Sequence, residues 1–449
     1  MKHMRVLIIS FLIFVINVTS AFAYDLVLPK EKRTVTTSEY AFFVGRAKNT
    51  EIININDERV YIASNGAFAH SIKLKEGENR IIVKSNLNTQ IYRFIKEKKA
   101  VQPKPEIVEF EPKNFVVKKD NTPLRKTPID YGMNRISHLF KDTNLIIDGE
   151  QGDFYRVFLS KDNYAWIAKE AVKVSKDELS PKFITLNSQT FKNASVHTIE
   201  FNEKLPYVIE ENDSEILFKV YNPFVLTGSV YTVNIRKPQK YSYKTISSNG
   251  VYVFKVSELP SCNTMTLEGL NILVDAGHGG TEKGAIGCLG DKEKDINLLI
   301  SNELKDILSL MGANVITTRE CDANVSLEDR VKIAQENCAN IFISVHLNSI
   351  PDIKMNIHKN KGTSVYYYNE NSKILAKSVL NSVISSLKTR NDGVRSASFA
   401  VLRPTDYVGI LVEVAYMTNP IDSVLYRQET FARQTAKAIA DGILNYINE

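Results

Sequence analysis

Residues 271–280 read NILVDAGHGG, and this stretch decides the fold of the C-terminal part of the chain. An apolar run of strand type, residues 271–274, leads into an acidic residue and a glycine-rich turn that carries His278. The glycines let the backbone turn tightly and leave the imidazole accessible. From here onward, apolar strand-like runs alternate with segments of helical spacing. This alternation predicts an α/β domain, with a mostly parallel sheet flanked by helices on both faces.

The downstream elements follow from apolar periodicity and from stop signals such as Gly312. We expect helices over residues 293–311, 372–387 and 430–447, and strands over residues 315–318, 341–345, 364–368 and 410–414.

Four titratable groups fall at or near the ends of these expected elements: His278, Glu293, His346 and Glu413. Sites in open α/β sheets form at the carboxyl ends of strands, so these groups can converge. Two histidines and a glutamate are a standard ligand set for catalytic zinc, and a further carboxylate suits proton transfer. The residues alone leave a structural interpretation open, in which the histidines pack and the glutamate pairs with an arginine.

Several short motifs in this region appear in a specific order. They are residues 274–280 (VDAGHGG), 284–287 (GAIG), 292–298 (KEKDINL), 318–320 (TRE), 326–330 (SLEDR), 344–349 (SVHLNS), 411–413 (LVE) and 418–420 (TNP). With them, residues 271–446 resemble the zinc-dependent amidase family that includes N-acetylmuramoyl-L-alanine amidases. This chain has Ala276 where proline is common in the family and Leu347 where alanine is usual, and neither change removes a ligand.

The resemblance implies one zinc ion held by His278, Glu293 and His346, with Glu413 as the catalytic general acid and base. It also implies a peptidoglycan substrate, cut at the amide between N-acetylmuramic acid and the L-alanine of the stem peptide. Two other functions stay open: a zinc peptidase that cuts inside the stem peptide, and a non-catalytic wall-binding protein.

Three further residues have two interpretations each. Asp275 either orients a metal ligand or caps the turn. Arg330 and Arg403 either hold stem-peptide carboxylates or pair structurally, and structural pairing is favoured for Arg330.

The region upstream of the α/β domain reads as short strands separated by turn signals. Residues 24–99 resemble an immunoglobulin-like β-sandwich, with an asparagine-glycine turn at 65–66. Residues 113–176 resemble a bacterial Src-homology-3-type barrel, in which Trp166 is expected in the core. Residues 177–262 resemble the β-rich wall-targeting modules found ahead of amidases, and His197 there is expected to be an ordinary strand residue. Residues 100–112, with three prolines, are expected to be an extended linker, and the catalytic domain is expected to span residues 270–449.

Residues 1–23 have the pattern of a signal peptide: a basic start, a short apolar run and small residues at 21 and 23. We therefore expect an exported protein, in the periplasm or cell wall, that meets the membrane only through this segment. The net charge of +6 is too weak and dispersed to indicate nucleic-acid binding. The four cysteines, Cys262, Cys288, Cys321 and Cys338, lack close metal-ligand spacing, and whether they form disulfides stays open.

Some relatives carry a long helix after the second histidine motif that blocks the zinc site. Here only residues 350–361 separate that motif from the next strand, and they are mostly polar. A stable blocking helix needs more length and an apolar face. We therefore expect an open site that requires no activator protein, with His358 on the surface.

Overall fold

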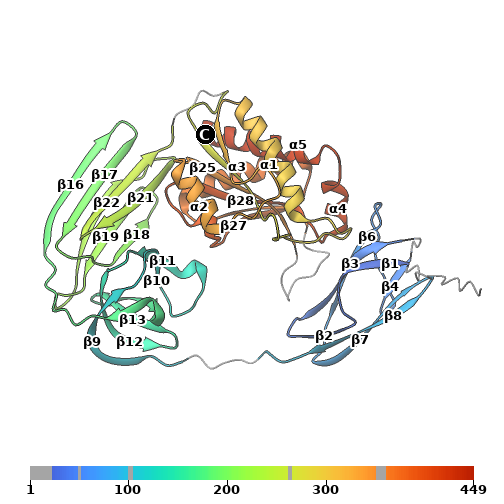
Figure 1. Ribbon diagram of the computed structural model, residues 1–449, viewed down its shortest axis with the longest axis horizontal. Coiled ribbons are helices and arrows are strands. Elements are labelled where there is room, and N and C mark those ends of the chain that lie inside the picture. The colour runs from blue at the N-terminus through green and yellow to red at the C-terminus, as the bar shows by residue number, and fades with distance from the viewer. Residues whose placement is uncertain (1–22, 49–51, 100–104, 261–264, 350–360) are drawn as a thin grey trace, which may run out of the picture.

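The computed structural model describes residues 23–48, 52–99, 105–260, 265–349 and 361–449 (Figure 1). The expected signal peptide up to residue 22, Cys262 and the loop 350–360 with His358 lie outside the described residues.

The N-terminal module is a β-sandwich of two sheets. One has the order β1 (Tyr24–Leu28), β3 (Tyr40–Ala47) and β6 (Ala67–Lys73). The other has the order β2 (Arg33–Thr36), β8 (Thr89–Lys96), β7 (Gly77–Ser85), β4 (Ile53–Ile55) and β5 (Glu58–Arg59). Their inward-facing side chains, Phe43, Phe68 and Ile81 among them, form one apolar core.

A seven-stranded sheet follows. Its order is β11 (Arg135–Leu139), β10 (Thr122–Arg125), β14 (Asn163–Ala168), β13 (Phe154–Ser160), β12 (Asn144–Gln151), β9 (Val108–Val117) and β15 (Val172–Val174). The expectation of an extended linker up to residue 112 is wrong in its second half, because β9 begins at Val108 and pairs with β12. Pro112 is tolerated there because the register shifts between Glu109 and Lys113, where no regular ladder bond is needed.

The third module is a sandwich of two antiparallel sheets. One has the order β16 (Phe183–Phe191), β17 (Ala194–Phe201), β22 (Val251–Glu258) and β21 (Tyr241–Ser248); the other has β18 (Tyr207–Glu211), β19 (Glu215–Asn222) and β20 (Ser229–Arg236). Its core is continuous with that of the preceding sheet, since Leu145 and Val157 belong to the same cluster as Phe218 and Phe254. Trp166 is buried, as expected. The second and third upstream modules therefore form one packed unit.

The C-terminal domain holds a six-stranded, mainly parallel sheet. Its order is β24 (Asn314–Thr317), β23 (Asn271–Ala276), β25 (Ile341–Asn348), β28 (Val408–Tyr416), β26 (Thr363–Tyr367) and β27 (Asn391–Ser396). Only the β26–β28 pair is antiparallel. Helices α1 (Glu293–Leu310), α3 (Lys373–Leu387) and α5 (Phe431–Asn448) cover one face, and α2 (Leu327–Glu336) covers the other (Figure 1). Both faces are buried, which explains why these strands read as continuous apolar runs.

Three elements of this domain were not expected from the sequence: α2, β27 and α4 (Pro420–Tyr426). The start of α2 does carry a signal, because the Ser326 side chain accepts a hydrogen bond from the backbone of Asp329, as an N-cap does. Strand β25 also runs further than expected, so His346 lies within the strand.

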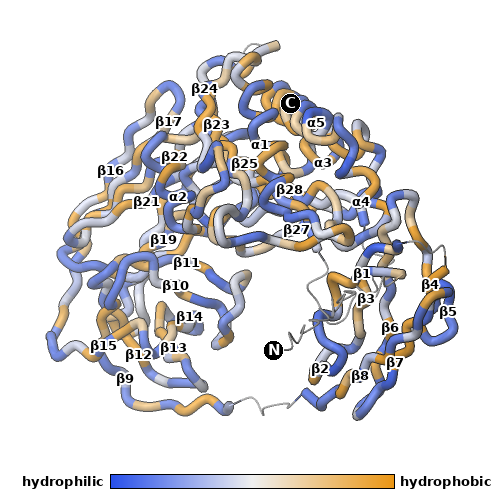
Figure 2. Tube along the Cα trace, turned by 45° about the vertical axis from the view of Figure 1, so that its right-hand side comes forward, coloured by the Kyte–Doolittle hydropathy of each residue, from blue (hydrophilic) through white to orange (hydrophobic). Residues whose placement is uncertain are grey.

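The upstream modules contact the C-terminal domain on two sides, and Figures 1 and 2 show them flanking it. On one side, Val44 and Ala67 of the N-terminal module pack with Cys288, and Asn65 donates a 3.1 Å hydrogen bond to Ser423 in α4. On the other side, the backbone of Tyr243 donates to the carbonyl of Thr405 at 2.7 Å. None of the helices in the described ranges combines the length and apolar character needed to cross a membrane.

The cysteines placed by the structure, Cys288, Cys321 and Cys338, are free thiols, with Cys288 buried and the other two exposed.

Candidate metal centre

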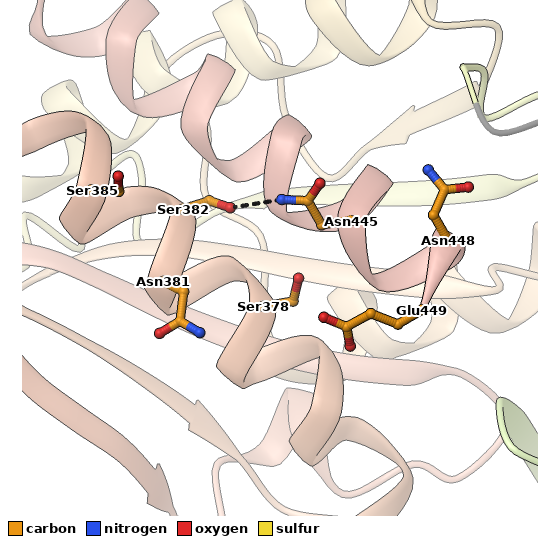
Figure 3. Close-up of a pocket in the computed structure, with 7 residues that line it drawn as sticks. All are labelled: Ser378, Asn381, Ser382, Ser385, Asn445, Asn448 and Glu449. Atoms are coloured by element: carbon orange, nitrogen blue, oxygen red, sulfur yellow. Dashed lines mark hydrogen bonds between the residues drawn. The ribbon is translucent and has the colours of Figure 1, made fainter.

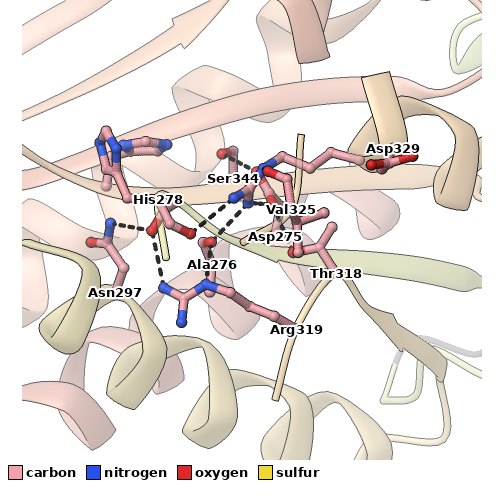
Figure 4. Close-up of polar contacts among 12 residues, drawn as sticks. Asp275, Ala276, His278, Asn297, Thr318, Arg319, Val325, Asp329 and Ser344 are labelled. Atoms are coloured by element: carbon pink, nitrogen blue, oxygen red, sulfur yellow. Dashed lines mark hydrogen bonds and ion pairs between the residues drawn. The ribbon is translucent and has the colours of Figure 1, made fainter. Parts of the chain in front are cut away.

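The loop after β23 presents His278 in the left-handed region, with φ of 60°. This conformation is uncommon for a residue with a side chain, so surrounding contacts must hold it. Two buried arginines supply them. Arg319 donates to the carbonyl of Ala276 at 3.0 Å (Figure 4) and to the carbonyl of Gly277 at 3.0 Å. Arg330 donates to the carbonyls of Ala276 at 2.8 Å and His278 at 2.9 Å.

The Asp275 carboxylate fixes Arg330 through a buried ion pair. It also accepts hydrogen bonds from Thr318 at 2.8 Å and Ser344 at 2.7 Å. Arg330 therefore pairs structurally, as expected. Asp275 was expected either to orient a metal ligand directly or to cap the turn, and its carboxylate contacts neither a proposed ligand nor the turn backbone. Its carboxylate acts on the His278 loop indirectly, by orienting the arginine that binds the loop carbonyls.

Arg319 is a positioning residue that the sequence did not single out beyond its motif. Its third backbone contact, to the carbonyl of Lys294 at 2.8 Å, ties the His278 loop to the first turn of α1, where Glu293 lies. The sequence did contain one signal for this role: Arg319 comes just after an apolar strand and therefore lies at the same sheet edge as the histidines.

Glu293 lies between the two histidines. Its Oε1 is 2.8 Å from Nδ1 of His346, and its Oε2 is 3.2 Å from Nε2 of His278. One ligand atom from each of the three residues can be chosen so that all lie within 4.8 Å of one another. The three residues expected to hold the metal are thus brought together, although they come from a loop, a helix and a strand.

The surroundings of Glu293 favour its ionised form. Burial raises the pKa of this carboxyl group, but hydrogen bonds and charge from His278 and His346 outweigh burial and leave the pKa well below its usual value. Burial lowers the pKa of His346, and the bond to Glu293 with its charge outweighs this effect, so that pKa is raised. The cluster therefore concentrates negative charge on a carboxylate flanked by two imidazole nitrogens.

The backbone before α1 approaches Glu293 closely. The amide of Ala285 donates to Glu293 Oε2 at 2.7 Å. At Gly284, with φ of +66°, an added Cβ would come within 2.5 Å of the same oxygen. A larger residue there would be strained and would collide with the carboxylate.

Glu413 lies on β28 next to His346, its register partner on β25. Its Oε2 is buried and, among the described residues, has no hydrogen-bond partner. Burial raises the pKa of this carboxyl to about 7; His346 lowers it and Glu293 raises it further. A buried carboxyl group that titrates near neutrality is what general acid–base chemistry requires.

Arg403 is not part of this centre. It lies before the start of β28, at the sheet edge opposite to His346 and Glu413, where it donates to the carbonyl of Ser398 at 2.8 Å and its Oγ at 2.9 Å.

A groove of about 520 Å³ between α3 and α5 is lined by serines, asparagines and Glu449 (Figure 3). It lacks the histidines and perturbed carboxyl groups of the metal centre.

Comparison with known proteins covers the C-terminal domain. A family model described as N-acetylmuramoyl-L-alanine amidase matches residues 272–445. The uncharacterized protein YqiI of Bacillus subtilis is 36% identical over 187 residues, which cover 41% of this chain and 87% of YqiI. The probable cell wall amidase LytH of Staphylococcus saprophyticus is 33% identical over 190 residues, which cover 42% of this chain but only 62% of LytH.

Among solved structures, the N-acetylmuramoyl-L-alanine amidase AmiC2 of Nostoc punctiforme is 37% identical and covers 40% of this chain and 99% of AmiC2, with a TM-score of 0.38. The family match begins at residue 272 and leaves the upstream modules unassigned. Because most of YqiI is matched at 36% identity and the family model spans nearly the whole C-terminal domain, the chain belongs, through this domain, to the N-acetylmuramoyl-L-alanine amidase family.

Proposed function

We propose that this protein hydrolyses peptidoglycan at the amide between N-acetylmuramic acid and the L-alanine of the stem peptide, with one zinc ion held by His278, Glu293 and His346. The observation that carries the proposal is the Glu293 carboxylate between two histidine nitrogens, at 2.8 and 3.2 Å. Beside it lies the buried Oε2 of Glu413, which has no hydrogen-bond partner in the part of the chain that the structure describes.

The donor set fits zinc rather than a harder cation. Two imidazoles and one carboxylate are characteristic ligands of catalytic zinc, whereas magnesium and calcium prefer oxygen ligands throughout. The His278 side chain is 31% exposed, so the cluster is open to solvent and substrate on one side.

A zinc ion bound here would polarise the scissile carbonyl and make a water molecule acidic enough to attack it. Glu413 then serves as the proton carrier. Its carboxylate accepts a proton from the attacking water and returns it to the departing nitrogen of L-alanine, which balances the hydrolysis. Because burial raises the pKa of Glu413 to about 7, both its protonated and its ionised form are accessible at neutral pH. The group can therefore both accept the proton and release it.

The test is digestion of purified peptidoglycan followed by mass spectrometry. The proposal predicts free stem peptides that begin with L-alanine, and glycan strands with unsubstituted lactyl groups. Peptides cut internally would instead identify a zinc peptidase, and unchanged peptidoglycan in the presence of zinc would favour the non-catalytic wall-binding protein.

The proposal extends to location and to the upstream modules. We propose that the protein is exported to the periplasm or cell wall, in line with the cell-wall naming of its relative LytH. We also propose that the immunoglobulin-like and Src-homology-3-like regions and the module after them bind the wall. An active site that needs no activator stays a prediction, since the segment that bears on it, residues 350–360, lies outside the described residues.

A further inference from the structure

Three arginines, Arg125, Arg135 and Arg403, lie where the second upstream module contacts the C-terminal domain. This contact region is called the seam below. The short helix at Gly132–Asn134 lies against Ser398, since a Cβ added to Gly132 would come within 2.7 Å of the serine Oγ. This seam lies at the sheet edge away from the metal centre.

Arg125 and Arg135 lie side by side on the module's side of this seam. They are register partners on the antiparallel strands β10 and β11. Like charges placed directly opposite on a strand pair are destabilising. The Arg403 guanidinium joins them from the C-terminal domain through its two bonds to Ser398.

The seam contains too little negative charge to balance these arginines. Asp130 pairs with Arg125 at 2.6 Å, but its side chain is 80% exposed. Within the described residues, neither Arg135 nor Arg403 forms an ion pair, and Nε of Arg135 is buried without a hydrogen-bond partner. Three guanidinium groups against one carboxylate leave a local charge of about +2, which is costly in a partly buried place.

His138 adds no compensating negative charge, and the positive charge of the same arginines affects its pKa. Burial lowers its pKa to about 4, and Arg135, Arg403 and Arg125 lower it as well. Burial is the larger cause, and the added effect of all three guanidinium groups on one imidazole agrees with their placement at a single seam.

We propose that this seam binds an oxyanion, a carboxylate or a phosphate group, held by Arg135 and Arg403 with Arg125 behind them. Guanidinium groups match the geometry of both anions and bind them through paired, charge-assisted hydrogen bonds. Two wall components carry this chemistry: the free carboxylates of stem peptides and the phosphodiesters of polyol-phosphate polymers. The site is separate from the scissile bond and supplies a second point of attachment to the wall.

The first experiment measures thermal unfolding of the full chain with and without inorganic phosphate, at matched ionic strength. We expect phosphate to raise the melting temperature of the wild type and of Arg433→Gln, an exposed arginine outside the seam. The shift should vanish in Arg135→Gln and Arg403→Gln, with phosphate affinity by calorimetry reduced about tenfold or more. Arg135→Gln should be as stable as the wild type, or more stable, without phosphate.

A different pattern would overturn the proposal. Equal phosphate shifts in all four proteins, or none in the wild type, would mean that the arginines only pack at the seam. Should Arg135→Gln fail to fold, Arg403→Gln alone decides the question, because its readout is ligand binding.

The second experiment separates the two sources of the anion. Glu413→Gln protein, used so that the substrate is not cut, is bound to wall material before and after removal of its phosphate-containing polymers. Binding that depends on Arg135 and persists after removal identifies peptide carboxylates, and binding that is lost identifies the polyol phosphate. If Arg135→Gln leaves binding unchanged in both materials, the oxyanion site is refuted, while the amidase proposal is unaffected.

Discussion

His346 and Glu413 are register partners on the neighbouring parallel strands β25 and β28. Their side chains therefore lie on the same face of the sheet, at a spacing set by the backbone ladder. A slip of one residue would turn Glu413 to the opposite face. The relation between the proposed ligand and the carboxyl group is thus set by the two central strands of the sheet.

Replacing Glu413 by glutamine keeps its shape but removes the proton carrier. Amidase activity should fall by about 10²–10⁴-fold, while folding and zinc content stay unchanged. The measurement is product release from peptidoglycan alongside zinc analysis. Glu336→Gln, on the exposed surface of α2, is the matched control and should remain active. Near-normal turnover in Glu413→Gln would assign the proton transfer to another group.

Replacing His346 by alanine removes one of the three proposed ligands. The variant should fold but lose most of its zinc, because two protein ligands hold the metal poorly. Metal content after gel filtration measures this loss. His197→Asn, far from the centre and bonded to Ser188 and Ser195, should retain the wild-type amount. Stoichiometric zinc in His346→Ala would rule out the ligand assignment.

The sequence predicted the C-terminal domain well because its signals are local and strong. Buried strands are continuous apolar runs, and the expected helix over residues 293–311 matches α1 to within one residue. The residues proposed for the centre lie in or next to such elements, so their convergence could be anticipated from the topology of a parallel sheet.

The missed features depend on contacts between distant segments. The role of Arg319 requires that carbonyls from β23, from the loop after it and from α1 surround it, and its position after an apolar strand does not specify these partners. The strand pairing at Val108 was hidden by prolines, because a register irregularity relieves the usual penalty only once the partner strand is known. The charge imbalance at Arg135 likewise appears only when two domains meet.

Replacing Asp275 by asparagine leaves Arg330 as an unpaired buried charge. Both side chains are 5% exposed or less, so the loss in unfolding free energy should be about 3–5 kcal/mol. Urea unfolding measures it, with the exposed Asp306→Asn on α1 as control. Adding Arg330→Gln should recover part of the loss. A cost below about 1 kcal/mol would contradict a structural role for this pair.

The reactivity of the Cys288 thiol measures whether the N-terminal module stays packed against the C-terminal domain. Burial raises its pKa to about 12, and Ala67 packs with it across the domain contact. In a Cys262→Ser background, a thiol reagent should label the exposed Cys321 and Cys338 at once and Cys288 only slowly. Ala67→Glu should undock the module and expose Cys288. Labelling of all three thiols at one rate in the undisturbed protein would show that the contact does not persist in solution.

His138 should make stability depend on pH between 6.5 and 4 in phosphate-free buffer. Its folded pKa of about 4 lies below its ordinary value of 6.5. Above pH 6.5 the ring is neutral in both states and contributes nothing. As pH falls through 6.5, the unfolded chain takes up the proton while the folded chain resists it, so stability declines until about pH 4. The total loss is at most about 3 kcal/mol.

His138→Gln removes this group, so the difference in unfolding free energy between wild type and variant should shrink or reverse as the pH is lowered. Urea titrations at several pH values between 7 and 4 measure the difference, which cancels the contributions of the carboxyl groups. Parallel profiles for the two proteins would show that His138 is not held neutral by burial and by the charges of Arg135, Arg403 and Arg125. Adding phosphate should weaken the effect, because an oxyanion at the seam would offset the arginine charge that disfavours the protonated ring.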